Sequence, residues 1–263
     1  MHSLKNGLRR TIFNPPLKTL AALPQRFWRW RRSLRRAHKM RRFYARFIQP
    51  GDLVFDVGAN VGSRTRLFLE LGAHIVAVEP QKECARSLFQ SFYANPDFHL
   101  VNKALGAAEG KSEIFISNSS LTTTLSRAWM QTATQKKYRG ITWPTSRQVS
   151  VTTLDALIQE YGLPSYVKID AECFEYEIVR GLSLPLPALS LEFIPLYLEP
   201  ALQSIDYLKR FGPIRLNYTL EERFTWMLKE WVKPDEMIVI LETYRASEEV
   251  NNGEVYACFM DIH

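Results

Sequence analysis

The sequence has few residues of the kinds that build metal centres or covalent frameworks. Its three cysteines, Cys84, Cys173 and Cys258, lie far apart, and no C-x-x-C pair is present. This spacing argues against a cysteine zinc site or a disulfide framework and favours a reducing, cytoplasmic compartment. The five histidines lie at the termini, in a basic segment or at expected strand starts. We expect none of them to be catalytic or to bind a metal ion.

A long apolar run is also missing. No segment is apolar over the length that a secretory signal or a membrane span requires, although 46% of the residues are hydrophobic. Acidic residues are absent from the first fifty positions, which hold fourteen of the 34 lysines and arginines. Acids therefore outnumber bases in the remainder. We predict a basic extension over residues 1–49, largely helical from about residue 24, followed by a globular domain over residues 50–263.

The basic extension interleaves arginine with tryptophan around Arg26-Phe-Trp-Arg-Trp-Arg-Arg32. Such a helix suits the headgroup layer of an anionic membrane, and basic residues with stacking aromatics also suit nucleic acid. The favoured interpretation is a helix that packs one side on the domain and makes loose contact with anionic surfaces. Peripheral membrane contact through residues 26–46 ranks second, and specific nucleic-acid binding is unlikely. The packed side would consist of Phe27, Trp30, Leu34, Phe43 and Phe47.

The most informative part of the chain is Val54-Phe-Asp-Val-Gly-Ala-Asn-Val-Gly62. Alternating apolar residues around Asp56 predict a buried parallel strand that ends in a tight turn and opens a helix. Gly58 allows a turn in which a Cβ would clash, and Gly62 allows a close approach of the helix. Ala59 and Asn60 complete a turn whose backbone would wrap a ligand.

A second expected strand, His74 to Val78, ends in Glu79-Pro80. A carboxylate at that point is placed to accept hydrogen bonds from both hydroxyls of a ribose. Asn102 to Leu105, just past a third strand and including Ala104, would line an adenine, although Asn102 is equally well explained as an ordinary strand-end residue. The pattern predicts a cofactor that contains adenosine.

The glycine spacing decides between such cofactors. A dinucleotide site usually has G-x-G-x-x-G, with helix amides facing a pyrophosphate, whereas this turn reads G-A-N-V-G and follows an acid. Asp56 would repel a pyrophosphate but suits the ammonium of a methionine moiety. S-adenosylmethionine therefore fits better than NAD, and an NAD-linked oxidoreductase is the weaker alternative.

Three blocks of the sequence resemble the signature of the FkbM family of methyltransferases. They are Val54–Gly62, Val78-Glu-Pro80, and Val167-Lys-Ile-Asp-Ala-Glu172 with Glu175, and they occur in the expected order. The resemblance extends from about Gly51 to Asp261 and implies an S-adenosylmethionine-dependent enzyme with the class I methyltransferase fold. It also implies methylation of a hydroxyl on a glycan, glycolipid or secondary metabolite. Cys173 stands where the family usually has glycine.

Strand and helix patterns alternate through the domain, which predicts a Rossmann-like, doubly wound α/β fold with a mostly parallel sheet. The resemblance implies an antiparallel last strand. A turn at Glu109-Gly110 before an alternating segment over 112–117 predicts a hairpin. The long Ser/Thr-rich segment 118–146 predicts a functional lid beside the cofactor. We expect strands at 53–57, 74–78, 98–102, 167–170, 188–193 and 255–260, and helices at 63–71, 81–93, 154–161, 175–182, 204–211 and 234–242.

The chemistry should involve the end of the strand over 167–170. Asp170, which would also contact the cofactor, and Glu172 share a side if the chain stays extended, and Lys168 has the same parity. Two adjacent carboxylates tend to raise one pKa, which makes a plausible base for a hydroxyl acceptor. Mg²⁺ bound by Asp170, Glu172 and Glu192 is the less favoured alternative, so we predict no metal. A non-catalytic binding or scaffold protein that keeps the cofactor fold is the remaining rival.

Overall fold

The computed structural model describes residues 35–135, 140–247 and 249–259. The chain forms two compact units, residues 1–40 and 41–263, and the strands and helices below belong to the second. Residues 35–44 are helical, in agreement with the later part of the predicted extension. The predicted Trp-Arg run and the predicted helix start near residue 24 lie outside the described residues.

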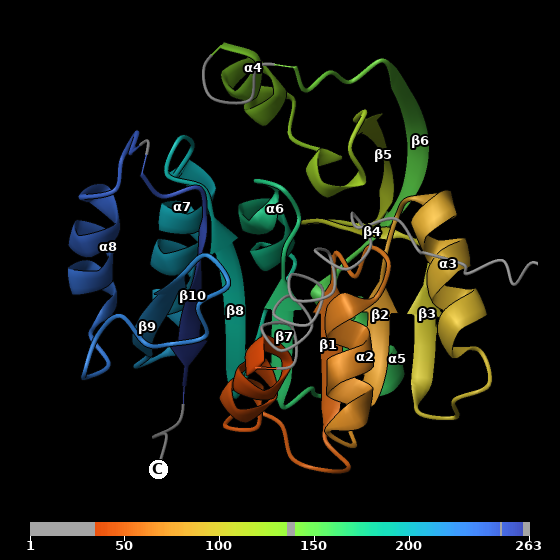
Figure 1. Ribbon diagram of the computed structural model, residues 1–263, viewed down its shortest axis with the longest axis horizontal. Coiled ribbons are helices and arrows are strands. Elements are labelled where there is room, and N and C mark those ends of the chain that lie inside the picture. The colour runs from red at the N-terminus through yellow and green to blue at the C-terminus, as the bar shows by residue number, and fades with distance from the viewer. Residues whose placement is uncertain (1–34, 136–139, 248, 260–263) are drawn as a thin grey trace, which may run out of the picture. The chain divides into compact units, whose positions relative to one another are not determined.

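The centre of the second unit is a seven-stranded sheet in the order β3-β2-β1-β7-β8-β10-β9. Neighbouring strands are parallel from β3 to β8, whereas β10 is antiparallel to both β8 and β9. The predicted Rossmann-like sheet with an antiparallel last strand is confirmed (Figure 1). The strands are β1 (Leu53–Val57), β2 (His74–Val78), β3 (Phe98–Val101), β7 (Tyr166–Ile169), β8 (Ala188–Phe193), β9 (Arg215–Leu220) and β10 (Gly253–Cys258).

Burial on both faces explains why the central strands are apolar almost throughout. Phe55 of β1 lies beside Val76 of β2 and Val167 of β7, and all three side chains are buried. In Figure 1, α2 and α3 lie in front of the sheet and α5 lies behind it. Parallel strands covered on both faces bring their carboxyl ends to one edge, and that edge is where ligands bind in such sheets.

Local signals position most of the helices. Thr153 caps α5 as expected, since its Oγ1 accepts a hydrogen bond of 3.1 Å from the Ala156 amide, and Pro234 begins α8. The largest differences from the predicted bounds are in α6, which ends at Val179, and in α7, which begins at Glu199 with Pro200 in its first turn and ends at Leu208. The helices are α2 (Ser63–Glu70), α3 (Lys82–Phe92), α4 (Arg127–Gln135), α5 (Leu154–Tyr161), α6 (Glu175–Val179), α7 (Glu199–Leu208) and α8 (Pro234–Glu242), with short 3₁₀ turns η1 (Ser120–Thr122) and η2 (Lys209–Phe211).

A second, three-stranded sheet lies at the carboxyl edge of the first. Its strands are β4 (Ala104–Leu105), β5 (Gly110–Ile116) and β6 (Thr145–Thr152), in the order β4-β6-β5. The predicted hairpin at Glu109-Gly110 is wrong, because β5 pairs antiparallel with β6 and β6 separates it from β4. Between β5 and β6 the chain forms η1 and α4, which Figure 1 shows above the central strands.

The residues just before β1 are part of the hydrophobic core of the second unit. Phe43 and Tyr44 are buried, and Phe43 contacts the rings of Trp226 and Tyr256 at centroid distances of 4.6 and 5.2 Å. Phe47 stacks on Tyr256 at 5.5 Å. The predicted packing of Phe43 and Phe47 on the domain is confirmed. These contacts place residues 41–49 with the sheet, ahead of the start predicted at residue 50.

Candidate functional site

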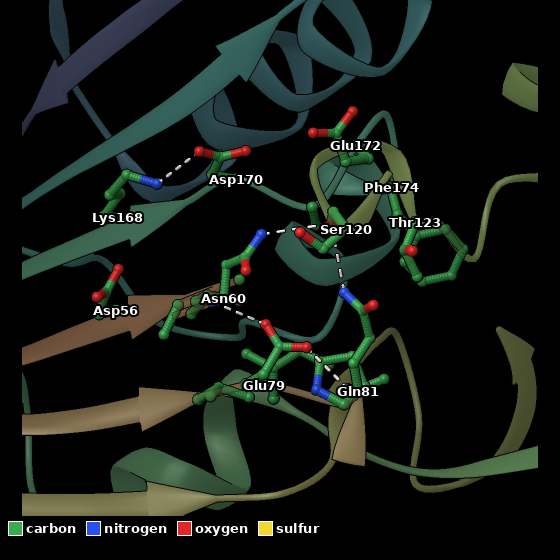
Figure 2. Close-up of a pocket in the computed structure, with 18 of the residues that line it drawn as sticks. Asp56, Asn60, Glu79, Gln81, Ser120, Thr123, Lys168, Asp170, Glu172 and Phe174 are labelled. Carbon is green, nitrogen blue, oxygen red and sulfur yellow. Dashed lines mark hydrogen bonds and ion pairs between the residues drawn. The ribbon is translucent and has the colours of Figure 1, made fainter. Parts of the chain in front are cut away.

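A cavity opens at the carboxyl ends of β1, β2 and β7. It is lined from one side by the turn after β1 and by Glu79 and Pro80, and from the other by Lys168, Asp170 and Glu172. The second sheet contributes Ala104, Leu105 and Ile114. Figure 2 shows polar side chains of the central strands pointing into this space. Most of the residues that the sequence assigned to one ligand site therefore converge, and Gly62 and Asn102 are the exceptions.

Gly58 makes the turn after β1 possible. Its φ is +75°, and a Cβ at this position would lie 1.8 Å from the backbone oxygen of Asp170. The amides of Gly58 and Ala59 both donate to the carbonyl of Val78, at 3.0 and 3.1 Å. Glycine is required here because the turn passes directly against the end of β7.

Gly62 contributes to helix packing and does not contact the cavity. It precedes α2 with a φ of +86°, and a Cβ would lie 2.7 Å from side-chain atoms of Leu88 and Phe92 on α3. The lack of a side chain at Gly62 therefore allows α2 to pack closely on α3. Gly62 lies outside the lining of the cavity.

Glu79 is held firmly at the end of β2. Its Oε2 accepts a hydrogen bond from the Asn60 amide and its Oε1 accepts one from the Gln81 amide, both at 2.8 Å (Figure 2). The residue is only 2% exposed, and burial raises the pKa of its carboxyl to about 7. Each oxygen keeps a second lone pair, so the group is oriented to accept two more hydrogen bonds from the cavity.

Asn102 supports this arrangement from behind. Its side-chain amide donates to the carbonyls of Glu79 and Pro80, at 2.7 and 3.3 Å. The side chain is thereby committed to the backbone after β2, and Asn102 lies outside the cavity lining, whereas Ala104 lies within it. Of the two interpretations of Asn102, the geometry favours the strand-end role.

Asp56 lies at the base of the cavity, fully buried. Its Oδ2 accepts a hydrogen bond of 2.6 Å from the Thr65 hydroxyl, while within the described residues no donor reaches Oδ1. Burial raises the pKa of this carboxyl, against the opposing charge of Lys168. A buried carboxylate oxygen without a partner suits a positively charged ligand group.

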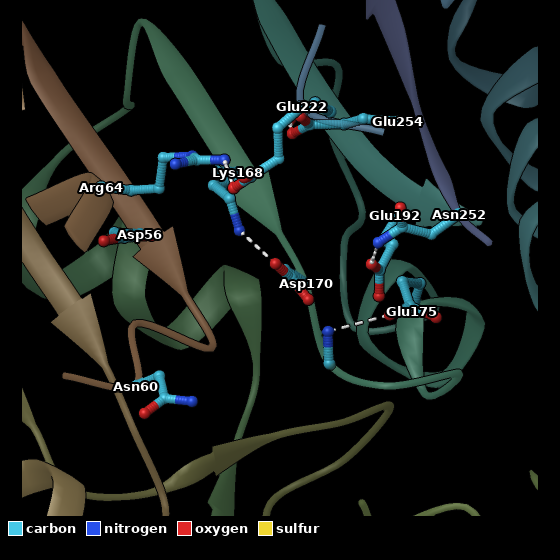
Figure 3. A network of polar contacts seen from close by, with 12 residues as sticks. Asp56, Asn60, Arg64, Lys168, Asp170, Glu175, Glu192, Glu222, Asn252 and Glu254 are labelled. Carbon is cyan, nitrogen blue, oxygen red and sulfur yellow. Dashed lines mark hydrogen bonds and ion pairs between the residues drawn. The ribbon is translucent and has the colours of Figure 1, made fainter. Parts of the chain in front are cut away.

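Lys168 and Asp170 form an ion pair at the end of β7. The Nζ–Oδ2 distance is 2.8 Å, and Lys168 is only 4% exposed (Figure 3). Burial would raise the pKa of Asp170, but the ammonium of Lys168 outweighs it and holds that pKa below the ordinary value. Asp170 is therefore a fixed carboxylate.

Glu172 and Glu192 complete a group of three carboxylates with Asp170. Each offers an oxygen that lies within 4.8 Å of the others. The extended chain expected through Ala171 is wrong, because β7 ends at Ile169 and Glu172 has a φ of +52°. Burial, followed by the charge of Asp170, raises the pKa values of both Glu172 and Glu192 well above the ordinary value. A carboxylate with a raised pKa is a stronger base once it is ionised.

Comparison with known proteins decides the family. The profile of the Methyltransferase FkbM domain matches residues 56–245, from Asp56 in β1 to beyond α8. The chain belongs to the FkbM methyltransferase family.

Other similarities are short or distant. The chain is 49% identical over 41 residues to ribosomal RNA small subunit methyltransferase A of Protochlamydia amoebophila (strain UWE25), a stretch that spans 16% of this chain and 14% of that protein. Precorrin-6y C5,15-methyltransferase from Geobacter metallireducens GS-15 has 12% identity and a TM-score of 0.43, over 86% of this chain and 87% of that one. An rRNA methylase from Streptococcus thermophilus has 10% identity and a TM-score of 0.44, over 85% and 96%. Similarity this low gives no information on the acceptor.

The FkbM methyltransferase has cavity residues that sequence reasoning missed. Arg64 in the first turn of α2, and Glu222 after β9, both line the cavity. Arg64 follows the glycine turn by two residues, and this short separation was the only feature of the sequence that could have placed it at the cavity. Glu222 carried no signal, because its place depends on how the chain after β9 returns to α2.

The segment predicted to be a lid is attached to the methyltransferase core at several points. Ser120, Leu121 and Thr123 line the cavity, and the Ser120 carbonyl accepts hydrogen bonds of 3.3 and 3.5 Å from the side-chain amides of Asn60 and Gln81. Trp129 of α4 is fully buried in a cluster that also contains Cys173, Ala133 and Ile194. Opening of the whole segment would expose this cluster, so any movement of the lid is expected near Ser120.

The backbone conformation at Cys173 explains why the family usually has glycine at this position. Its φ is +66°, in the region that glycine adopts without strain, yet its thiol is buried beside Trp129. The Cys173→Ala variant loses thiol packing and keeps the strain, so we expect its free energy of unfolding to fall by about 1 kcal/mol. The Cys173→Gly variant should stay within about 1 kcal/mol of the natural protein, because relief of strain offsets the lost packing.

Chemical denaturation of the three proteins measures this order. A glycine variant clearly less stable than the alanine variant would show that the left-handed conformation at Cys173 carries no strain.

Proposed function

We propose that this FkbM-family enzyme transfers a methyl group from S-adenosylmethionine to a hydroxyl of a glycan, glycolipid or secondary metabolite. The observation that carries the proposal is the Glu79 carboxylate, held by two backbone amides at the edge of a cavity that continues to Asp170 and Glu172. An oriented acceptor of two hydrogen bonds suits the vicinal hydroxyls of a ribose. The turn Gly58-Ala59-Asn60 would follow the cofactor, and Asp56 would face its ammonium group.

The end of β7 supports the chemical part of the proposal. S-adenosylmethionine supplies an electrophilic methyl group when bound, and an acceptor hydroxyl must lie in line with it and lose a proton. Asp170, fixed by Lys168, would orient the acceptor hydroxyl as a hydrogen-bond acceptor. Glu172, with its raised pKa, would take the proton.

Charge at this end of the cavity bears on the acceptor class. Asp170, Glu172 and Glu192 lie together, with Lys168 already paired to Asp170. Like charges repel, so this group favours a neutral or cationic acceptor over the phosphate backbone of a nucleic acid. The hydroxyl on a glycan or metabolite comes from the family resemblance and is consistent with this charge.

Calorimetry tests the proposal directly. Titration with S-adenosylmethionine and S-adenosylhomocysteine should give heat and a one-to-one complex, whereas NAD should give none. Heat from neither sulfur ligand would favour a scaffold protein, and heat from NAD alone would favour an oxidoreductase. Labelled methyl transfer to a panel of sugars and polyols, with the O-methyl product identified by mass spectrometry, then tests the acceptor.

Variants can separate the role of the carboxylates in the reaction from any role in cofactor binding. In Asp170→Asn and Glu172→Gln variants we expect turnover on an active acceptor to fall about 10- to 100-fold, because each loses one charge while two neighbouring carboxylates remain. Affinity for S-adenosylhomocysteine should change far less. Glu177→Gln is the matched control, since Glu177 is a partly exposed acid on α6 that pairs with Arg180 and lies outside the cavity lining.

Near-normal turnover in both variants would move the base to Glu192. Loss of turnover in the natural protein on addition of a chelator, with recovery on Mg²⁺, would instead support a metal held by the three carboxylates.

The basic segment supports a second proposal, peripheral contact with anionic membrane through residues 26–46. Arg41, Arg42 and Arg46 are exposed, although Phe43 between them is buried. Among the described helices, none is both long enough and apolar enough to cross a bilayer. The Arg46 guanidinium lies over the rings of Phe43 and Trp226, whereas the exposed Arg41 and Arg42 can face a charged surface.

We expect the full chain to bind vesicles that contain phosphatidylserine and to leave pure phosphatidylcholine vesicles unbound. Replacing Arg29, Arg31, Arg32, Arg35 and Arg36 with Gln should weaken vesicle binding, by about 1 kcal/mol for each charge near the surface. Co-sedimentation at low and high salt measures the effect. Unchanged binding in this variant would contradict the proposal, and tighter binding to RNA than to vesicles would favour nucleic acid instead.

A further inference from the structure

Arg64 projects into the cavity from the first turn of α2. Its side chain is 15% exposed, and Nη2 lies 3.2 Å from Oε1 of Glu222 (Figure 3). The guanidinium also lies over the rings of Phe224 and Tyr44, 5.3 and 5.9 Å from their centroids. These aromatic contacts hold the group in place independently of the ion pair.

Glu222, the partner of Arg64, is the more exposed of the two side chains. Glu222 has a side chain 50% exposed and follows β9, outside any strand or helix. A half-exposed ion pair of this kind adds little to stability, so a competing carboxylate can replace Glu222 at small cost. Lys168, the other cation lining this end, is already bonded to Asp170.

Positive and negative groups alternate at this end of the cavity. Arg64 and Lys168 lie near Asp56 in Figure 3, and Asn60 lies farther away, toward Glu79. A ligand whose ribose is bound at Glu79 and whose chain follows the turn from Asn60 would extend toward Asp56 and Arg64. The methionyl end of the proposed cofactor is a zwitterion, with an ammonium and a carboxylate on the same carbon.

We propose that Arg64 binds the carboxylate of the methionyl end of S-adenosylmethionine and that Glu222 gives way to it. The inference rests on the proposed function. The guanidinium presents parallel N–H donors that match a carboxylate. Arg64 and Glu222 both line the cavity, so a carboxylate that enters it would compete with Glu222 for the guanidinium. Arg64 is then the residue that distinguishes the complete cofactor from adenosine compounds without an amino-acid end.

A pair of ligands that differ in one group tests this. S-adenosylhomocysteine and its decarboxylated analogue share adenosine, thioether and amine, and only the first has the carboxylate. In the natural protein we expect the Kd of the analogue to be on the order of 10- to 100-fold higher. In Arg64→Gln the two Kd values should be equal within about threefold, because the carboxylate has lost its partner.

Control variants separate binding from folding. Glu222→Gln should bind S-adenosylhomocysteine as well as the natural protein or a few times more tightly, because a competing charge is removed. Arg64→Lys keeps the charge without the fork, and its Kd ratio should fall between the other two; it replaces Arg64→Gln if that variant fails to fold.

The outcomes that contradict the role of Arg64 differ from those that contradict the proposed cofactor. Equal affinity of the natural protein for the two ligands, or an unchanged ratio in both Arg64 variants, would overturn the role of Arg64. Failure of the natural protein to bind either ligand would overturn the proposed cofactor itself.

Discussion

A Gly58→Ala variant is expected to lose more than about 4 kcal/mol of its free energy of unfolding, a large part of the stability of an ordinary domain. Alanine at a φ of +75° costs about 1 kcal/mol by itself. The larger part comes from the backbone oxygen of Asp170, which would lie 1.8 Å from the new Cβ. That atom cannot turn aside as a flexible side chain can, so β1 and β7 must separate.

Thermal unfolding measures this effect, and we expect a decrease in Tm of about 10 °C or more. Gly51→Ala is the matched control, because Gly51 has a φ of +88° and no described atom lies within 4 Å of its added Cβ. Its loss should stay near 1 kcal/mol. Equal losses in the two variants would show that the turn and the end of β7 are not in close contact.

A Glu79→Ala variant is expected to bind S-adenosylhomocysteine at least about 100-fold more weakly than the natural protein. Two charge-assisted hydrogen bonds to the ribose would be lost, at about 1.5–3 kcal/mol each, and 1.4 kcal/mol corresponds to a factor of ten. The Asn60 and Gln81 amides would also lose their acceptor, which loosens the turn that follows the cofactor. Calorimetry measures the Kd. Glu83→Ala is the control, an exposed acid in the first turn of α3.

The pH dependence of binding supplies a second test of Glu79. Burial raises its pKa to about 7 in the free protein, so the ionised fraction increases as pH rises from 6 to 8. The ionised form accepts both hydroxyl hydrogens, and affinity should therefore increase by up to about tenfold over this range. The Glu79→Ala variant should lack the increase. A natural protein whose affinity is flat between pH 6 and 8 would contradict the assignment of the ribose to Glu79.

Local patterns in the sequence were sufficient for the central part of the fold. The strands that end at Val57, Val78 and Ile169 are apolar runs followed by turn residues, and their carboxyl ends must meet at one edge once the sheet is parallel. The positions of Asp56, Glu79 and Asp170 around one cavity follow from that rule. Pro234 likewise fixes a helix start through its restricted φ, and Thr153 does so through its side-chain hydrogen bond to the Ala156 amide.

Two predictions failed because residues that are close in the sequence are not the ones that contact each other in the structure. The turn at Gly110 has the composition of a hairpin, but β5 pairs with β6, which the chain reaches only after α4. Glu172 reaches Asp170 and Glu192 through a left-handed turn rather than an extended strand. Neither the pairing of β5 nor the turn at Glu172 can be predicted from neighbouring residues, since each depends on which surface a distant segment of the chain buries.

The sequence by itself indicated the family, through three motif blocks that resemble its signature. It also determined where the central strands lie and which acids end them, because these depend on short-range periodicity and turn chemistry. Only the tertiary structure decided that Asn102 supports the backbone behind Glu79, that Gly62 serves helix packing, and that Arg64 meets Glu222 across 158 positions of chain. Contacts of that kind form when distant segments bury their apolar sides together, and the polar groups at their ends then meet where the packing leaves them.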